Sequence, residues 1–131
     1  MITPDMHPAM QGVFPSVIVT CNKAGEPNTT TISQVFFVDE THVALSFQFF
    51  NKTIRNVREN PKATVQIMCP QTLLAWSLEV EFDHSETEGE LFEQMDMQLE
   101  AIASMSGMSG IFKLQGADVY RVKSVQTISY N

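Results

Sequence analysis

The stretch Ser46–Met68, SFQFFNKTIRNVRENPKATVQIM, decides the fold, because it predicts a strand, a short helix and a second strand in succession. Four of the eight Lys and Arg residues of the chain lie in it, although the protein is acidic overall. Asn51 is a good N-cap for the helix. Pro61 requires the helix to stop by Asn60, because proline disfavours helical geometry in the residue before it.

The start of this predicted helix is a candidate anion site. The free N–H groups of the first turn, the helix dipole and the Lys52 ammonium would point toward one place, which suits a phosphate. Lys52, Arg55 and Arg58 share one face, whereas Ile54 and Val57 form a separate apolar stripe that can dock on a core. The alternative is that the basic face is simply solvated.

Composition indicates one globular domain that covers residues 1–131. The chain is 44% hydrophobic and 18% charged, which is ordinary for a folded domain. Its net charge of −7 argues against nucleic-acid binding, which depends on many cationic contacts to phosphates. The N-terminus MITPDMHPAMQG lacks a secretory pattern, and no apolar run approaches the ~18 residues that span a bilayer. We therefore expect a cytoplasmic protein without a membrane or nucleic-acid partner.

Residues that could carry metal or nucleophilic chemistry are dispersed. Cys21 and Cys69 lie in or at the end of predicted strands without a CxxC motif, so we expect buried structural thiols rather than a disulfide or a metal site. His7, His42 and His84 have no partner at metal-ligand spacing. We expect no metal site, and no side chain has the surroundings of a catalytic nucleophile.

Strand signals dominate the chain up to Asp83. Residues 74–83 alternate strictly between apolar and mostly polar side chains, which is typical of a half-buried strand. A turn at 23–27 predicts a hairpin between the first two strands. The predicted strands are Ser16–Asn22, Asn28–Val38, His42–Phe47, Ala63–Met68, Leu74–Asp83 and Asp118–Ile128.

A second helix is predicted after the fifth strand. Residues 87–90 form a capping box with Thr87 as the N-cap, and Gly107 is the expected stop. Apolar residues recur at helical spacing through this segment: Leu91, Met95, Leu99 and Ile102. We interpret its Met-rich stripe, which includes Met95 and Met97, as core filling. Without repeats or a linker, the strands must close in one antiparallel sheet covered by the helices, and a small barrel satisfies this requirement.

The order of these elements resembles the pyridoxamine 5′-phosphate oxidase-like family, the FMN-binding split barrels. The resemblance implies a mainly β fold, a six- or seven-stranded antiparallel split barrel with two to three covering helices. The tail at 110–122 is similar to a subgroup often found ahead of a sensory domain, so the chain is either whole or the N-terminal part of a longer protein. The segments that carry the resemblance are 15–20, 25–28, 50–53 with Asn56, 59–65 and 110–122.

The resemblance implies FMN as the cofactor and assigns its contacts residue by residue. The second strand would lie along the ring and ribityl chain, the end of the third strand would continue the cradle, and the helix start would hold the phosphate. A position on the fifth strand would touch the flavin as well, although core packing is the alternative for its tryptophan. These contacts fall on Thr30, Thr31, Ile32 and Ser33, on Ser46 and Phe47, on Asn51, Lys52 and Thr53, and on Trp76.

Two functions follow from the resemblance. One is an FMN-dependent oxidoreductase that acts on an unidentified small substrate. The other is a binding or sensory module that holds FMN, a deazaflavin or haem without turnover. The vitamin-forming reaction of a true pyridoxamine phosphate oxidase is not expected, because Thr30 stands where that enzyme has a basic residue and the C-terminal residues 125–131 lack its arginine.

The resemblance also implies a two-fold homodimer with each flavin at the subunit interface. Five phenylalanines are many for one small barrel, and some of them would need a surface to cover them. They are Phe36, Phe37, Phe47, Phe49 and Phe50.

Overall fold

The structure is a computed structural model that describes residues 1–32, 34–47, 52–105 and 114–128. In these residues, a short 3-10 helix and a one-turn helix precede a β-rich body. The elements are η1 (Pro4–Met6), α1 (His7–Met10), β1 (Ser16–Cys21), β2 (Pro27–Ile32), β3 (Phe36–Asp39), β4 (His42–Phe47), α2 (Lys52–Glu59), β5 (Lys62–Met68), β6 (Ala75–Glu86), α3 (Glu90–Met105) and β7 (Gly116–Ile128).

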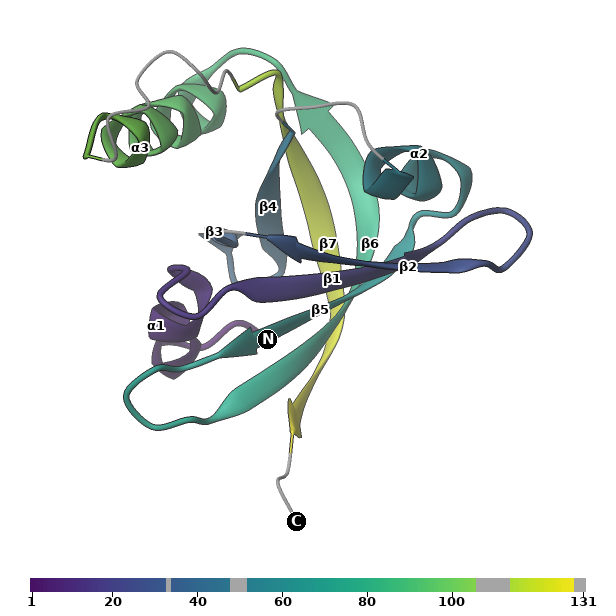
Figure 1. The fold of residues 1–131 in the computed structure, drawn as a ribbon, viewed down its shortest axis with the longest axis horizontal. Helices are drawn as coiled ribbons and strands as arrows, with labels where there is room; N and C mark the ends of the chain where they lie inside the picture. Colours follow the sequence, from purple (N-terminus) through teal and green to yellow (C-terminus); the bar gives the residue numbers. More distant parts are fainter. Residues whose placement is uncertain (33, 48–51, 106–113, 129–131) are drawn as a thin grey trace.

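The seven strands of the described residues form one antiparallel sheet in the order β2-β1-β5-β6-β7-β4-β3. In Figure 1, β1 and β2 run across the view while β4 and β7 stand nearly upright, and the long strand β6 lies between these two parts of the sheet. The helices lie around the sheet at separate places. This architecture confirms the predicted mainly β antiparallel split barrel.

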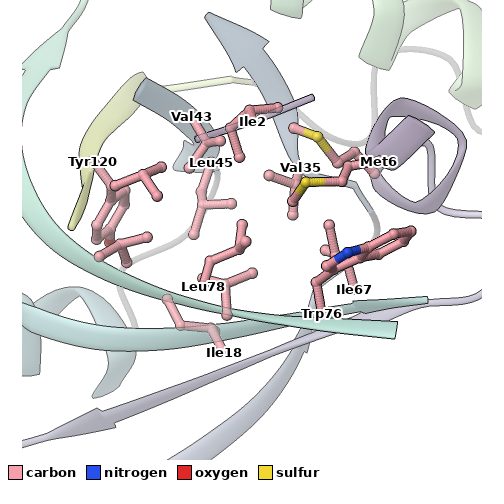
Figure 2. Close-up of a cluster of buried hydrophobic side chains, with 14 of the residues drawn as sticks. Ile2, Met6, Ile18, Val35, Val43, Leu45, Ile67, Trp76, Leu78 and Tyr120 are labelled. Carbon is pink, nitrogen blue, oxygen red and sulfur yellow. The ribbon is translucent and has the colours of Figure 1, made fainter. Parts of the chain in front are cut away.

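The main core fills the inside of the curled sheet. Its side chains come from several strands of the curled sheet and from the N-terminal segment. Figure 2 shows this for Ile18 of β1, Leu78 of β6, Tyr120 of β7 and Met6 of the N-terminal segment. A smaller cluster between α3 and the β3–β4–β7 part of the sheet contains Met95. Burying such side chains contributes about 1.5–3 kcal/mol each relative to exposure, so the two clusters hold the sheet and α3 in place.

The predicted strand Asn28–Val38 is wrong as one element. It divides into β2 and β3, which lie at opposite ends of the strand order. The Val35 side chain is buried in the main core, and its N–H donates to the Met10 carbonyl oxygen at 2.9 Å. The backbone therefore turns toward α1 at this point and leaves the ladder that β2 makes with β1.

The boundaries of two other elements differ from their predictions. β6 begins at Ala75, and Leu74 lies before it with an exposed side chain. α3 begins at Glu90, two residues later than Thr87 as the N-cap would place it. Gly89 has φ +98°, a left-handed conformation that glycine adopts without strain, and its carbonyl accepts the N–H of Glu93 at 3.0 Å. The predicted stop at Gly107 lies outside the described residues.

The core assignment of the methionine stripe is confirmed for Met95 and wrong for Met97. Met95 is buried on the side of α3 that faces the sheet, whereas Met97 on the same helix is 70% exposed. Residues two apart on a helix point about 200° apart around its axis, so both could not face the sheet. The N-terminal segment also supplies core side chains, because Met6, Ala9 and Met10 are buried in the main core.

Candidate functional site

The helix α2 separates charge from packing surface, as its sequence predicts. It starts at Lys52 and ends at Glu59, just before Asn60 and Pro61. Its basic side chains are exposed, while Ile54 and Val57 are buried. The docked stripe sets the orientation of the helix, and the orientation in turn determines where its first turn points.

A cluster of three polar side chains joins the first turn of α2 to strand β2. The Thr30 and Thr53 hydroxyl oxygens lie 3.0 Å apart, and Asn28 Nδ2 donates to both of them at 3.1 Å. Thr53 is buried, and the other two are partly buried. We call Asn28, Thr30 and Thr53 the polar cluster. It brings together two segments that the sequence predicts to hold different parts of one cofactor.

A second polar contact fixes α2 to the neighbouring strand β1. The buried Asn56 donates from Nδ2 to the hydroxyl oxygen of the buried Thr20 at 3.1 Å. Buried polar groups of this kind are costly when unpaired. Thr53 and Asn56 therefore hold successive turns of the helix over β2 and β1, in agreement with the position of α2 beside β2 in Figure 1.

Arg58 does not join Lys52 in one anion-binding face of α2. Lys52 has an exposed side chain at the first position of the helix and no ion pair within the described part of the chain. Arg58 instead turns toward β6 and β7, with its guanidinium carbon 5.3 Å from the centre of the Phe82 ring. Its Nη2 lies 4.0 Å from an oxygen of Asp118. Lys52 therefore stays at the helix start, away from the contacts that Arg58 makes.

The Asp118 carboxyl group is buried beneath Arg58. It accepts a hydrogen bond from the Ser85 hydroxyl, and its residue is only 2% exposed. Burial raises the pKa of Asp118 above the ordinary value, although the Ser85 hydrogen bond and the Arg58 charge act in the opposite direction. Burial also raises the pKa of the neighbouring Tyr120. Asp118 pairs with Leu45 of β4, so this group connects α2 to the β4–β7 part of the sheet.

The predicted contacts on β2 alternate between two faces of the strand. Thr30 and Ile32 point inward, Thr30 into the polar cluster and Ile32 onto the main core, whereas Thr31 is exposed on the other face. β2 is the terminal strand of the described sheet, so its outer backbone edge has no strand partner there. A planar ligand could contact this backbone edge, but one ligand face could not meet the side chains of both Thr30 and Thr31.

The other predicted contacts come from β4, β6 and two positions that the structure does not describe. Ser46 is half-buried near the end of β4, and Phe47 pairs with Gly116 through its backbone. Trp76 is 7% exposed and packs in the main core, where Figure 2 places it near Ile67 and Met6. Ser33 and Asn51 lie outside the described residues.

Asn28 is the site residue that sequence reasoning missed. Its spacing was an available signal, because Asn28 and Thr30 are two apart on a strand and so share a face. The sequence could not show that Thr53, 25 positions from Asn28, lies against that face.

The described residues also bear on three other features: a metal site, a disulfide and a membrane-spanning helix. None of their His, Cys, Asp and Glu side chains form a group of three or more that could hold a metal ion. Both thiols are free; Cys69 is buried as predicted, whereas Cys21 is only half-buried. Across the same residues, the helices are too short or too polar to cross a membrane.

Comparisons with known proteins agree with this fold. The sequence profile of the family described as pyridoxamine 5′-phosphate oxidase matches residues 2–123. A structure of an FMN-binding protein from Syntrophomonas wolfei superposes with a TM-score of 0.78 at 16% identity, over 97% of this chain and 88% of that protein. A search of curated proteins gives no match.

Two further solved structures share the fold. HupZ of Group A Streptococcus has a TM-score of 0.74 at 18% identity, over 98% of this chain and 94% of its own. HutZ of Vibrio cholerae, described as a heme storage protein, has a TM-score of 0.57 at 15% identity, over 93% of this chain and 89% of its own. At such identities, the likeness extends to the fold alone.

Proposed function

Because this chain belongs to the pyridoxamine 5′-phosphate oxidase family, we propose that it is an FMN-binding flavoprotein and an oxidoreductase that acts on a small substrate. The observation that supports this most directly is the polar cluster, in which Thr53 of α2 meets Thr30 of β2 at 3.0 Å. This contact places the start of α2, with the exposed cation of Lys52, beside β2, which is one of the two terminal strands of the described sheet.

The residues present suit the parts of FMN. A phosphate needs a cation, hydrogen-bond donors and a favourable dipole; Lys52, the Thr53 hydroxyl and the first turn of α2 are of these kinds. A flavin ring needs an apolar slot and backbone hydrogen bonds to its polar edge. The outer edge of β2 has no strand neighbour within the described sheet. In a chain of net charge −7, this local cation is the feature that favours an anionic ligand.

In this proposal, each chain segment has one role. Lys52 and Thr53, with Asn51, hold the phosphate, while Asn28 fixes the rotamers of the two threonines from within the polar cluster. The outer backbone edge of residues 30–33 contacts the ring, and Ser46 and Phe47 continue the cradle. FMN, when bound, supplies hydride transfer through its ring, and the protein supplies position and exclusion of water.

An absorbance spectrum of the purified protein tests FMN binding. Oxidised flavin gives two bands between roughly 350 and 500 nm, so we expect these bands in the protein as isolated or after addition of FMN and removal of the excess. Addition of NADH or NADPH without oxygen should bleach them if the protein is an oxidoreductase with a nicotinamide donor. A colourless protein that takes up no FMN would refute the proposal.

The second candidate is a binding module without turnover that holds FMN, a deazaflavin or haem. It is favoured by the structural similarity to HutZ, which is described as a heme storage protein. Protein that binds haem in preference to FMN, or binds FMN but cannot be reduced by any nicotinamide or organic donor, would support this second function.

We further propose that the protein is a cytoplasmic homodimer with the cofactor at the subunit interface. Phe37 supports an interface, because it is 44% exposed on the terminal strand β3. Its neighbour Phe36 is buried in the cluster under α3. Phe49 and Phe50 lie outside the described residues.

A further inference from the structure

A cleft of about 520 Å³ opens between α3, α1 and the segment that joins β2 to β3. Figure 1 shows α1 and α3 at one side of the sheet with β3 between them. The volume lies within the range of small-molecule sites, ~300–1,000 Å³. Buried Met10, Val35 and Met95 contribute apolar surface to its lining. The cleft is distinct from the polar cluster, whose residues do not line it.

Among the residues that the structure describes, those that line the cleft include no Asp, Glu, Lys or Arg. This is unexpected for α3, whose sequence ELFEQMDMQLEAIASM is rich in acids. Glu90, Glu93 and Asp96 stay out of the cleft, whereas Gln94 and Gln98 line it. The helix therefore presents glutamine amides to the cleft, while its acidic side chains are exposed to water. One of these acids, Glu90, accepts a hydrogen bond from Gln94 Nε2 at 3.4 Å and so helps to position that amide.

Some polar side chains of the cleft are held in place by a hydrogen bond or a ring contact and still have unused hydrogen-bonding capacity. Gln34 Nε2 donates to Gln98 Oε1 at 3.2 Å, which connects the β2–β3 segment to α3. An amide has both donor and acceptor capacity, so Gln34 Oε1 and Gln98 Nε2 remain available for a ligand. The His7 ring lies 4.4 Å from the Phe37 ring, and His7 Nε2 is a buried nitrogen without a hydrogen-bond partner in the described structure.

This combination selects for one class of ligand. An anion in the cleft would lose water without gaining a cation from any of the described lining residues, and such desolvation is costly. A flat uncharged ring could pack between the apolar side chains, with Phe37 at one side. A ring nitrogen or a carboxamide on it could pair with His7 Nε2 and the two glutamine amides. We propose that this cleft binds an uncharged, planar heteroaromatic compound that carries an amide-like polar group.

The position of the cleft gives this ligand a role. Gln34 follows Ile32 and Ser33, the residues predicted to line the flavin ring, and Gln34 is itself part of the cleft. The cleft therefore begins where the predicted ring site ends. This position makes the neutral compound a candidate substrate that accepts electrons from the reduced flavin. The role as substrate rests on the proposed function, whereas the binding itself does not.

Nicotinamide and nicotinate are suitable probes, because they share one ring and differ in an amide against a carboxylate. Each would be titrated at millimolar concentration into isotope-labelled full-length protein and followed by NMR. We expect nicotinamide to shift the signals of residues 7–11, 34–37 and 91–101. We expect nicotinate to bind at least about tenfold more weakly, because its charge has no partner in the cleft.

Two substitutions test which residues make the selection. Gln98→Lys adds a cation to the cleft and should reverse the preference, so that nicotinate binds more tightly than nicotinamide. Gln66→Lys makes the same change on the exposed surface of β5 and should leave the preference unaltered. His7→Phe keeps a ring against Phe37 but removes the nitrogen, and should weaken nicotinamide binding about 3- to 10-fold.

The inference is overturned if the two probes bind equally, if neither shifts the cleft signals, or if Gln98→Lys leaves the preference as it was. The titrations would be made on flavin-free protein and on protein with added FMN. Cleft binding in a protein that takes up no FMN would sustain the neutral-ligand site and refute the proposed flavin function. FMN uptake without cleft binding would refute the neutral-ligand site alone.

Discussion

Lys52 is the side chain on which the proposed anchoring of FMN depends, because it is an exposed cation at the first position of α2. Lys52→Ala should weaken FMN binding by about 1–3 kcal/mol, the range for loss of a charge-assisted hydrogen bond. Calorimetric titration of both proteins measures this difference. The melting temperature of the ligand-free protein should change little, because substitutions at exposed positions seldom affect stability.

Two controls make the Lys52 experiment specific. Riboflavin lacks the phosphate, so it should bind the original protein and Lys52→Ala about equally. Lys62→Ala removes another exposed lysine, at the start of β5, and should leave the FMN affinity unchanged. Equal FMN affinity for the original protein and Lys52→Ala would show that the phosphate is not held at the start of α2.

Asp118 makes the stability of the protein depend on pH. Its pKa is raised in the folded state, chiefly by burial, so folding favours the protonated carboxyl. As pH rises above the unfolded value of about 3.9, the unfolded chain releases this proton first, and Asp118 reduces the free energy of unfolding until its folded pKa is passed. Asn cannot ionise, so it does not have this dependence.

Asp118→Asn should therefore gain stability relative to the original protein as pH rises from about 4 to 7. The asparagine can still accept the Ser85 hydrogen bond, although it gives up the attraction of Arg58, which lies 4.0 Å away. Melting temperatures of both proteins across this pH range measure the difference. A difference that stays constant with pH, or that moves the other way, would contradict the raised pKa.

At the scale of elements, the position of α2 depends on a few polar contacts as well as on its apolar stripe. Thr53→Val keeps the shape of the side chain but leaves Asn28 and Thr30 without their shared partner. We expect the free energy of unfolding to fall by about 1–3 kcal/mol and the melting temperature by several degrees. Because the start of the helix would lose its tie to β2, FMN binding should weaken as well.

Thr29→Val is the matched control for this substitution. Thr29 is exposed on the opposite face of β2 from Thr30, so its stability change should stay within about 0.5 kcal/mol. Thermal unfolding of both variants gives the comparison. If both lose the same stability, the effect of Thr53→Val would belong to general strand or helix propensity and not to the polar cluster.

Several elements were predictable because their signals are local. Alternation along residues 75–83 predicts the dry face of β6, and Trp76, Leu78 and Val80 are buried as it requires. The end of α2 follows from the covalent geometry of Pro61 alone. The break between β2 and β3 was not predictable in this way, because it depends on the burial of Val35 against the N-terminal segment.

At the scale of the whole molecule, the exposed edges of the sheet bear on assembly. The strand order leaves β2 and β3 as the terminal strands of the described sheet, with Phe37 44% exposed on β3. We expect light scattering at micromolar concentration to give twice the 14.7 kDa chain mass, in agreement with a two-fold dimer. A mass of one chain, with or without FMN, would count against a cofactor site shared between subunits.

The sequence by itself determined the mainly β class, the β1–β2 hairpin, the separation of charge from packing on α2 and the resemblance to a flavin-binding family. These depend on turns, side-chain periodicity and helix stops, which act over a few residues. Only the tertiary structure decided that Asn28 and Thr53 share one cluster, that Trp76 lies in the core and that α3 turns its glutamines toward a neutral cleft. Periodicity records which face of an element is dry, but which other element covers that face depends on the packing of the whole chain.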